Sequence, residues 1–368
     1  MRRVVVAGHE ANPEHVDEAA SAIRAGKLVV LPTETVYGIA ADPRSESSIE
    51  RVREFKRRPS ELVFTHHLAD VAAARSLVGE IPARAKKLMD RYWPGPLTMV
   101  VPISDGGTVG LRVPGHALGR EVARALGGSV FLTSVNRSGE PPLVDPDSIE
   151  AAFGGELDLL FDAGPPPLRE ASTVARWRPV PGLEALGEDA DDFAEIEVLR
   201  QGVLAAEDLW RTAAASWWFV CTGNTCRSPM AEALARREVA RRLRTTDDRV
   251  LAHGLWFRSA GITAIDGLPA SDRAQEVLAE LDVPLAQHRS HALRADALVD
   301  AQRIFCLGPS HLVAVAALRP DLAERAELLD PAGHGIPDPY GGDLATYRRA
   351  REAIRHAVEQ RIDEILPR

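Results

Sequence analysis

The chain has 368 residues, of which 45% are hydrophobic and 26% are charged, as is typical of a soluble globular protein with two domains. The net charge of −9 argues against a generally basic nucleic-acid binder. The apolar runs are too short for a membrane span or a signal peptide, and the three cysteines show no pairing pattern, so we expect a cytoplasmic protein.

The first 200 residues mix helical and strand-like segments in an irregular order. Apolar residues at helical spacing predict a helix over Pro13–Arg24, and Lys27–Leu31 predicts a short strand. Ile49–Phe55 predicts a second helix, which carries Lys56 and Arg58 at its C-terminal end. Strand-like runs follow within residues 92–101, 108–116, 131–139, 171–175 and 198–202. The mixture predicts an α/β domain with an open twisted sheet and a concave face.

Several polar residues of this half are suited to a nucleotide and a small polar ligand. Lys56 and Arg58 can both address a triphosphate, and Asn136 can bond a phosphate, a sugar or a base. The other candidates are hydroxyl, arginine and histidine side chains in turns or near strand ends: Thr35, Thr108, Ser134, Ser172, Arg112, Arg200 and His67. Each taken singly also has a structural explanation, such as a solvated basic helix end or a structural histidine. Spacing alone indicates no reaction.

The strings that carry these residues resemble the YrdC-type threonylcarbamoyl-AMP synthases. In that family's order, across roughly residues 10–203, they are PTETVYG, Lys56-x-Arg58-Pro59, YWPGPLT, GLRVPGH, TSVN followed by SG, STV and VLRQG. The resemblance implies condensation of L-threonine, bicarbonate and ATP into threonylcarbamoyl-adenylate with release of pyrophosphate. This is the first step toward the threonylcarbamoyl mark on adenosine 37 of ANN-reading tRNAs.

The resemblance also assigns residues to the substrates, position by position. It places L-threonine near Thr35, His67, Arg112, Ser134 and Ser172. It places ATP near Lys56, Arg58, Thr108, Asn136 and Arg200. Mg²⁺ is expected to bridge the nucleotide phosphates, and no residue is expected to hold a metal ion of the protein's own.

Two segments depart from the family's pattern. Leu62-Val63-Phe64 stand where Lys or Asn and then Pro-Leu are usual, so one polar contact on the phosphate side is missing. Ala163 and Pro165-Pro166-Pro167 stiffen the segment ahead of the STV string, which is normally rich in glycine. Adenylation is then weakened, or the pocket is reshaped.

These departures leave alternatives open. This half can be an RNA- or nucleotide-binding module without synthase activity, or a scaffold or nucleotide sensor for the second half. Residues 1–205 carry 23 Lys and Arg against 30 Asp and Glu, a net −7, which argues against strong affinity for RNA.

An acidic segment separates the two halves of the chain. Residues 179–197 hold seven Asp and Glu residues and predict a charged surface loop. An alanine-rich stretch over 203–215 follows. We predict domains over residues 1–205 and 216–368, joined by a helical or loose linker over 206–215.

The second half opens with WWFVCTGNTCRSPMAE, residues 217–232. Its apolar start predicts a strand end, and Pro229 suits the first turn of a helix. Cys221 and Arg227 lie in the loop between them with five residues separating them, a spacing that lets loop N–H groups converge on an anion at the helix N-terminus. The same field favours a thiolate at Cys221, and Arg227 can fork onto two phosphoryl oxygens.

The string CTGNTCRSPMAE resembles the phosphate loop of the low-molecular-weight protein-tyrosine-phosphatase family, and the resemblance extends over roughly residues 217–368. It implies a doubly wound parallel sheet with the loop at the carboxyl ends of its strands. Cys221 is then the nucleophile of a phosphocysteine mechanism, and Arg227 holds the charge of the transition state. The remaining loop residues, among which Asn224 and Ser228 brace the sulfur, are Thr222, Gly223, Asn224, Thr225, Cys226 and Ser228. A buried cysteine that merely precedes an arginine fits Cys-x5-Arg but not the whole string.

A general acid is expected late in the chain. Asp338-Pro339-Tyr340 lies in a loop rich in glycine and proline before the final helix, and it matches the family's Asp-Pro-aromatic motif. Asp338 would protonate the leaving group and then activate water against the phosphocysteine. The alternative for this dipeptide is an ordinary turn.

The leaving group stays open. Thr225 occupies a position where tyrosine-directed members carry a bulkier apolar residue, and CTGNTCRS resembles the branch that acts on phosphoarginine. Phosphotyrosine, phosphoarginine and small phosphoesters all remain candidates. Arsenate reductases share the loop but need further redox cysteines, and Cys306 is predicted to be a core residue, which argues against that activity. Cys226 can pair with Cys221 in a reversible disulfide that protects the thiol from further oxidation.

The whole chain is therefore predicted to be a cytoplasmic bifunctional enzyme, a synthase fused to a phosphatase. Its expected partners are L-threonine, bicarbonate, ATP, a phosphoprotein or small phosphoester, and tRNA or tRNA-modification proteins.

Overall fold

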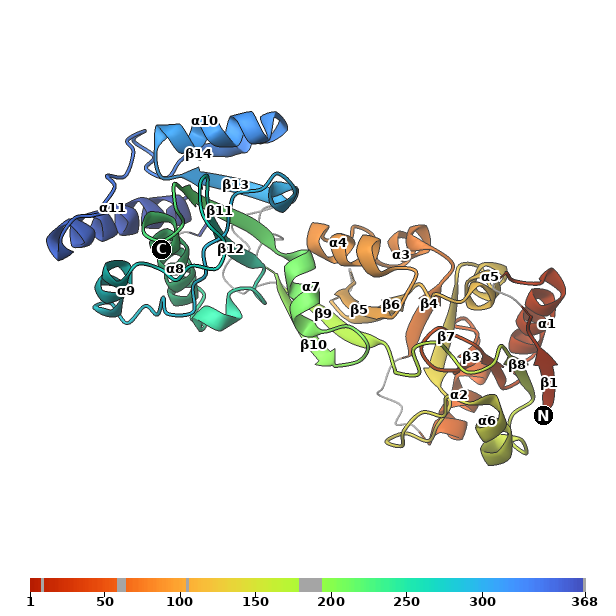
Figure 1. Ribbon diagram of the computed structural model, residues 1–368. Coiled ribbons are helices and arrows are strands. Elements are labelled where there is room, and N and C mark those ends of the chain that lie inside the picture. Colours follow the sequence, from red (N-terminus) through yellow and green to blue (C-terminus); the bar gives the residue numbers. More distant parts are fainter. Residues whose placement is uncertain (8–9, 58–63, 104–105, 179–193, 367–368) are drawn as a thin grey trace. The chain divides into compact units, whose positions relative to one another are not determined.

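A computed structural model describes residues 1–7, 10–57, 64–103, 106–178 and 194–366. The chain forms two compact units and passes from the first to the second between Ala213 and Ala214 (Figure 1). Within the described residues, no helix is long and apolar enough to cross a membrane.

The first unit is built on a mixed sheet, which has ten strands in the described residues. In chain order they are β1 (Arg2–Val5), β2 (Val29–Leu31), β3 (Gly38–Ala41), β4 (Thr65–Leu68), β5 (Leu97–Pro102), β6 (Thr108–Arg112), β7 (Ser129–Ser134), β8 (Leu159–Asp162), β9 (Thr173–Arg178) and β10 (Glu195–Arg200). Their order in space is β1-β8-β2-β3-β7-β4-β6-β5-β9-β10, with parallel and antiparallel neighbours. The predicted α/β class with an open sheet is confirmed.

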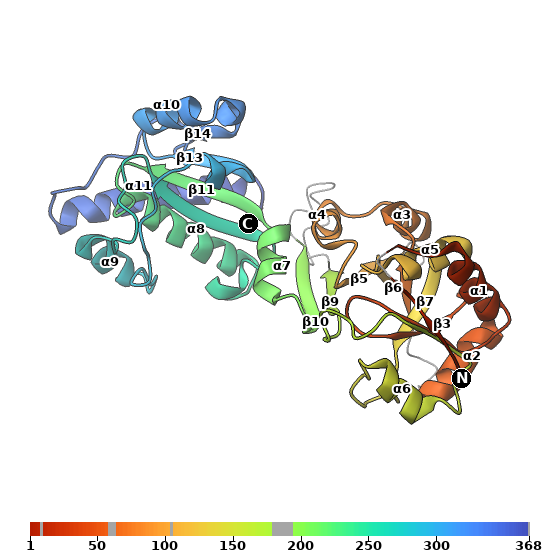
Figure 2. The same ribbon diagram turned by 45° about the vertical axis from the view of Figure 1, so that its right-hand side comes forward.

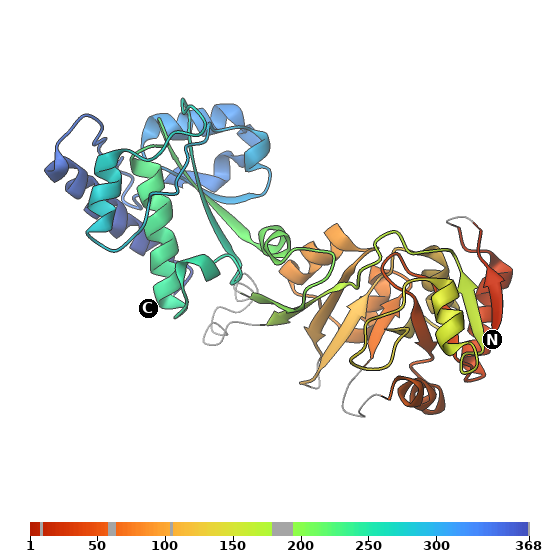
Figure 3. The ribbon, with the colours of Figure 1, turned by 60° about the horizontal axis from the view of Figure 1, so that its bottom comes forward.

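Helices cover both faces of this sheet. They are α1 (Pro13–Arg24), α2 (Glu46–Lys56), α3 (Val71–Val78), α4 (Ala83–Tyr92), α5 (Ala117–Ala125), α6 (Pro146–Phe153) and α7 (Ala206–Ala213). Buried residues of α1 and α5 join Val29 and Leu31 in one core, whereas those of α2 and α6 join Val30 in another. Alternate residues of β2 thus face opposite helix layers. Figure 3 shows helices of this unit on both faces of its sheet.

Local sequence explains where α1 and α2 begin and end. The predicted helix over Pro13–Arg24 is present, and the Asn12 side chain accepts a hydrogen bond from the N–H of Glu14 at its start. Helix α2 begins at Glu46, three residues before the predicted Ile49, because Ser45 caps it. It ends where Arg57 takes a left-handed conformation with φ 51°, so that Lys56 is its last helical residue.

The region between the halves differs from the sequence-based expectation. Residues 179–193 of the acidic segment lie outside the described residues, but Glu195 and Glu197 belong to β10, antiparallel to β9. There they lie 3.6 Å and 3.5 Å from Arg178 and Arg176, so cross-strand charge pairing keeps them in a sheet. Most of the stretch expected to be a linker forms α7, whose Leu209 and Ala213 are buried in the core of the first unit.

The second unit has a smaller sheet, which has four strands in the described part of the chain. The strands are β11 (Ala215–Cys221), β12 (Leu255–Gly261), β13 (Ala301–Cys306) and β14 (Ala326–Leu328). The helices are α8 (Arg227–Arg242), α9 (Asp272–Ala279), α10 (Pro309–Leu318) and α11 (Leu344–Asp363), with 3₁₀ turns η2 (Asp247–Arg249), η3 (Asp296–Leu298) and η4 (Pro320–Arg325). All pairings are parallel, in the order β12-β11-β13-β14, as predicted for this half.

Both faces of the parallel sheet are buried, which explains the unbroken apolar run before Cys221. Trp217 and Phe219 share one core with α8, α9 and α11, while Trp218 and Val220 share another with α10. Figure 2 shows these helices around the sheet. Cys221 is the last residue of β11, so the loop that follows starts at the carboxyl edge of the sheet.

Candidate active sites

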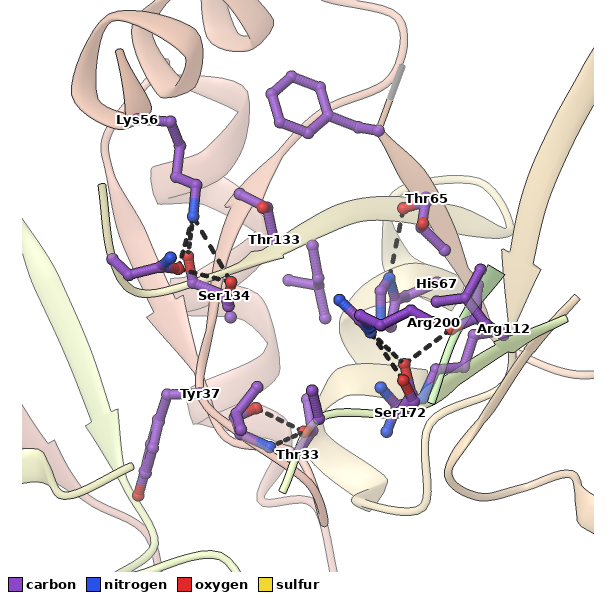
Figure 4. A pocket seen from close by; sticks show the side chains of 18 of the residues that line it. Thr33, Tyr37, Lys56, Thr65, His67, Arg112, Thr133, Ser134, Ser172 and Arg200 are labelled. Atoms are coloured by element: carbon purple, nitrogen blue, oxygen red, sulfur yellow. Dashed lines mark hydrogen bonds between the residues drawn. The ribbon is translucent and has the colours of Figure 1, made fainter. Parts of the chain in front are cut away.

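A cavity of about 420 Å³ opens on the sheet of the first unit (Figure 4). Its walls come from β3, β4, β5, β6, β7, β9 and β10, the end of α2 and neighbouring loops. The lining side chains are mainly polar. They include Thr33, Tyr37, Lys56, Thr65, His67, Thr98, Arg112, Thr133, Ser134, Asn136, Ser138, Ser172 and Arg200.

Lys56 brings a buried cation to one side of this cavity. Its side chain is only 3% exposed, and Nζ donates to Ser134 O at 2.7 Å and to Asn136 Oδ1 at 2.6 Å. Ser134 Oγ donates to the same amide oxygen at 2.6 Å. The amide nitrogen of Asn136 donates to the carbonyls of Arg137 and Glu140, which fixes the orientation of the amide. A positive charge held this firmly suits an anionic group that enters the cavity.

Arg112 supplies a second buried cation at the end of β6. Its Nε donates to Gly95 O at 3.0 Å, and Nη2 donates to Glu34 Oε1 at 2.5 Å and Thr35 Oγ1 at 2.8 Å. The other carboxylate oxygen of Glu34 accepts from the N–H of Gly115 at 2.6 Å. The guanidinium is therefore held in one orientation at the cavity wall.

Arg200 and Ser172 lie on the same side of the cavity as Arg112 (Figure 4). Arg200 Nη2 donates to Ser172 O at 2.7 Å and lies 3.2 Å from its Oγ, which is also 2.9 Å from Thr98 Oγ1. Burial, and then the neighbouring charge of Arg112, lower the pKa of Arg200. Two guanidinium groups so close together favour an anion between them.

His67 is a neutral group in this polar cavity. Burial chiefly, with the charge of Arg112, lowers its pKa to about 3. Its Nδ1 lies 3.3 Å from Thr65 O, so this nitrogen carries the proton. The ring can therefore hydrogen-bond a ligand but brings no charge near neutral pH.

The structure brings most of the predicted substrate residues together. Lys56, His67, Arg112, Ser134, Asn136, Ser172 and Arg200 line the cavity. Thr35 is fully buried behind it and reaches it through Arg112. Ser134, predicted on the threonine side, lies beside Lys56, and its role toward threonine stays a prediction.

One predicted ATP residue, Thr108, does not line the cavity. It is exposed at the start of β6, opposite Pro102, and its place near ATP stays a prediction. Arg112 lies at the other end of this strand. Strand geometry separates its two ends by about 13 Å. Arg58 lies outside the described residues.

The segments that depart from the family pattern are partly described. Leu62 and Val63 lie outside the described residues, whereas Phe64 is buried and lines the cavity. Tyr37 Oη donates to Gly164 O at 2.6 Å and accepts from the N–H of Ala163 at 3.0 Å. Its burial raises the pKa of Tyr37 to about 12, so the hydroxyl stays protonated and anchors this segment.

Residues missed by the sequence analysis fall into two groups. The first group lies within the strings PTETVYG and YWPGPLT, and its place in those strings could have marked it: Thr33, Glu34, Tyr37 and Thr98. Thr65 and Thr133 line the cavity only because β4 and β7 are neighbours, and no local pattern marks them.

The second unit carries a phosphate-loop geometry after β11. Cys221 Sγ lies 2.9 Å from Ser228 Oγ and accepts from the N–H of Asn224 at 3.3 Å. Asn224 has φ 54°, which turns the loop back over the sulfur. The loop ends at Cys226, and α8 starts at Arg227, so backbone N–H groups of the helix start face the loop.

A buried network holds the loop from the α8 side. Asn224 Nδ2 donates to Ser228 Oγ and Ser259 Oγ, each at 2.9 Å, and Ser259 donates to Glu232 at 2.7 Å. The N–H of His291 donates to Asn224 Oδ1 at 2.7 Å. Gly261 lies against the loop, where a Cβ would come within 2.5 Å of Thr222 O, so a side chain there would push the loop away. The predicted bracing by Asn224 and Ser228 thus has a geometric basis.

The two remaining predicted catalytic residues lie together. Arg227 is 7% exposed, and its Nη1 donates to Ile336 O at 3.0 Å. Its Nη2 donates to Asp338 Oδ2 at 2.5 Å. The loop before α11 therefore brings the carboxyl group of Asp338 to the phosphate loop.

The other loop residues differ in exposure. Thr222 is exposed, whereas Gly223 and Thr225 are half-buried. Cys226 is buried near Tyr347 Oη at 3.3 Å and Ser271 Oγ at 3.4 Å. Burial raises the pKa of Cys306 to about 12, which agrees with its prediction as a core residue. Among the residues that the structure describes, no cluster of three or more His, Cys, Asp or Glu could hold a metal ion.

Family models match both halves of the chain. The model for Sua5, YciO and YrdC proteins, described as "Telomere recombination", matches residues 21–183. The model described as "Low molecular weight phosphotyrosine protein phosphatase" matches residues 216–366. The chain therefore combines a Sua5/YrdC domain with a low-molecular-weight phosphatase domain.

Several curated proteins that are similar to the first unit are threonylcarbamoyl-AMP synthases. A putative threonylcarbamoyl-AMP synthase of Mycobacterium tuberculosis is 34% identical over 45% of this chain and 81% of its own length. The threonylcarbamoyl-AMP synthase of Nitrosococcus oceani is 31% identical over 44% of this chain and 95% of its own. By its first unit the chain belongs to the threonylcarbamoyl-AMP synthase family. It spans only 57% and 50% of the lengths of the Pyrococcus abyssi and Bacillus subtilis synthases, with identities of 35% and 32% over 49% and 44% of this chain.

Solved structures similar to the chain include members of both families. A low-molecular-weight protein tyrosine phosphatase from T. tengcongensis has 30% identity, covers 41% of this chain and 99% of its own, and has a TM-score of 0.37. The YwlE arginine phosphatase from Geobacillus stearothermophilus has 29% identity over 41% and 92%, with a TM-score of 0.36. A variant of P. abyssi Sua5 has 22% identity over 70% and 92%, with a TM-score of 0.49.

Proposed function

We propose that the chain is a bifunctional enzyme, an L-threonylcarbamoyladenylate synthase followed by a cysteine-dependent phosphatase. The synthase would supply threonylcarbamoyl-AMP for the modification of adenosine 37 in tRNA. The observation that carries this half is one cavity that joins the Lys56 cluster to the Arg112 and Arg200 cluster in a member of the synthase family.

The reaction follows from the two charged sides of this cavity. The amine of L-threonine and bicarbonate form a carbamate with loss of water. The carbamate carboxylate then attacks the α-phosphorus of ATP, and pyrophosphate leaves. Lys56 and Arg200 would balance the phosphate charge, with Ser134 and Asn136 donating or orienting hydrogen bonds. Arg112 would hold the threonine carboxylate, because its bonds to Glu34, Thr35 and Gly95 keep the guanidinium in one orientation at the cavity wall. Mg²⁺ would enter with the nucleotide and shield its phosphates.

The test of the synthase is product analysis. The protein is incubated with ATP, Mg²⁺, bicarbonate and L-threonine, and pyrophosphate release is followed together with the mass of the nucleotide. A threonylcarbamoyl-AMP mass that requires both bicarbonate and threonine supports the proposal. ATP binding without this product would instead favour a nucleotide-binding module. RNA binding that weakens steeply with salt, in a protein that forms no product, would favour an RNA-binding module.

The phosphatase half would use a phosphocysteine intermediate. The Cys221 thiolate attacks phosphorus, the bond to the leaving group breaks, and Asp338 gives that group a proton. The Asp338 carboxylate then takes a proton from water as the water attacks the phosphocysteine. The supporting observation is that Cys221, Arg227 and Asp338 converge at one helix start.

The phosphatase substrate is proposed as a phosphoprotein carrying phosphotyrosine or phosphoarginine, and Thr225 is compatible with phosphoarginine. The test compares matched peptides with each modification, with p-nitrophenyl phosphate as a general substrate. Rapid quenching and mass analysis should find the phosphoryl group on Cys221. Hydrolysis without such an adduct, and undiminished in Cys221→Ser, would contradict the mechanism.

A further inference from the structure

His311 approaches the phosphate loop from the sheet face opposite α8. It lies in the first turn of α10, which follows β13, the neighbour of the strand that ends at Cys221 (Figure 1). Its Nε2 lies 3.0 Å from Oγ1 of Thr222, the residue directly after the nucleophile. The loop is therefore held on both sides, by the Asn224 network and by His311.

The surroundings of His311 define the direction of this hydrogen bond. The side chain is buried, with 2% exposure, and Nδ1 has no hydrogen-bond partner among the described residues. An orphaned buried N–H is rarer than an orphaned acceptor, so the proton belongs on Nε2 and points at Thr222. Burial, with the charge of Arg227 next, lowers the pKa of His311 to about 4 and keeps the ring neutral.

This arrangement leaves the Thr222 hydroxyl hydrogen free. The oxygen accepts from Nε2, and its own O–H can turn toward an anion in the loop, because Thr222 is exposed. A neutral imidazole donor does not compete with Arg227 for the phosphoryl group.

We propose that His311 is a positioning residue of the phosphatase, which orients the Thr222 hydroxyl toward the phosphoryl group bound in the loop. The proposal rests on the phosphatase function. Its step is hydrogen bonding alone, and His311 touches neither the leaving group nor the reacting atoms.

The test is a double-mutant cycle with p-nitrophenyl phosphate. His311→Ala and Thr222→Val should each raise KM about five- to tenfold and leave kcat within about twofold, as expected for one lost hydrogen bond. The double variant should be no worse than either single variant, because both remove the same interaction. His311→Gln, whose Nε2 can donate in place of the imidazole, should recover most of the loss.

Other outcomes would overturn the proposal. Additive losses in the double variant, or no recovery with glutamine, would mean that His311 acts only through packing. Thr222 is exposed, so Thr222→Val should fold normally and gives the cycle a variant whose kinetics do not reflect misfolding. If wild-type protein hydrolyses no phosphoester or phosphoarginine, the phosphatase function fails, and calorimetry with inorganic phosphate still tests the pair. Equal phosphate affinity in all four proteins would then refute the role of His311.

Discussion

Asp338 Oδ2 accepts a hydrogen bond from Arg227 Nη2 at 2.5 Å, so the proposed general acid is paired with the proposed phosphate ligand. A phosphoryl group that enters the loop must compete with this carboxylate for the guanidinium. The Asp338 side chain is 47% exposed and that of Arg227 only 8%, so the carboxylate has room to move into solvent while the arginine stays. We therefore expect substrate to replace Asp338 as the partner of Arg227.

Asp338→Asn should separate acid catalysis from anion binding. We expect kcat to fall about 10²- to 10³-fold, because the leaving group loses its proton donor. Affinity for inorganic phosphate should rise or stay constant, because a competing negative charge is removed. Steady-state kinetics and competitive inhibition by phosphate measure both effects. Asp321→Asn removes an exposed carboxylate paired with Arg319 elsewhere in the unit and should change neither, whereas weaker phosphate binding at normal kcat in Asp338→Asn would contradict this account.

Lys56→Met should abolish adenylate formation. The buried ammonium group donates to Ser134 and Asn136. Methionine at this position removes the cation that would bind the nucleotide phosphates. We expect at least a hundredfold loss in pyrophosphate release, by analogy with the loss of other charge-stabilising groups. Lys27→Met, at an exposed position outside this cavity, is the matched control. Equal synthase rates in the two variants would rule out the assigned role of Lys56.

Arg112→Lys should affect threonine more than ATP. Lysine cannot reproduce the three hydrogen bonds to Gly95, Glu34 and Thr35, so the cation is no longer held in one orientation. We expect the KM for L-threonine to rise about ten- to hundredfold, with a smaller change in the KM for ATP. Arg51→Lys, in an exposed pair with Asp158, is the control. The assignment fails if the threonine KM of Arg112→Lys matches this control.

His67 should make the first unit less stable in mild acid. Burial lowers the pKa of His67 in the folded protein to about 3 from its ordinary value of 6.5, so below pH 6.5 the unfolded chain binds a proton that the folded cavity excludes. Stability is therefore lost as the pH falls from about 6.5 toward about 3, by about 1.4 kcal/mol per pH unit. Relative to His67→Asn, wild-type protein should lose about 2 kcal/mol more between pH 7 and pH 5 in urea unfolding. Parallel pH profiles in the two proteins would show that His67 does not titrate in this way.

Local patterns predicted the elements that hold the chemistry. The helix over Pro13–Arg24 has a clear apolar stripe, and the run before Cys221 is apolar on both faces because both faces of its strand are covered. The phosphate loop could be predicted because its residues are contiguous, so that Cys221, Asn224 and Arg227 needed no knowledge of topology.

The cavity of the first unit was harder to predict, because neighbouring strands assemble it. Thr108 and Arg112 occur in one string, but strand geometry places them at opposite ends of β6. Glu34, which fixes Arg112, could be found only after β6 and the loop at Glu34 were brought together in space. Glu195 and Glu197 resembled a charged loop because cross-strand arginines, distant in sequence, were not visible as their partners.

The most direct test of two independent active sites is a crossed comparison of two variants. Wild type, Cys221→Ser and Lys56→Met are each assayed for threonylcarbamoyl-AMP formation and for p-nitrophenyl phosphate hydrolysis. Cys221→Ser should lose at least about 10⁴-fold in hydrolysis and keep wild-type synthase rates. Lys56→Met should lose at least about a hundredfold in synthesis and keep wild-type hydrolysis. Loss of both activities in either well-folded variant, or synthesis of no adenylate by wild type, would contradict the account.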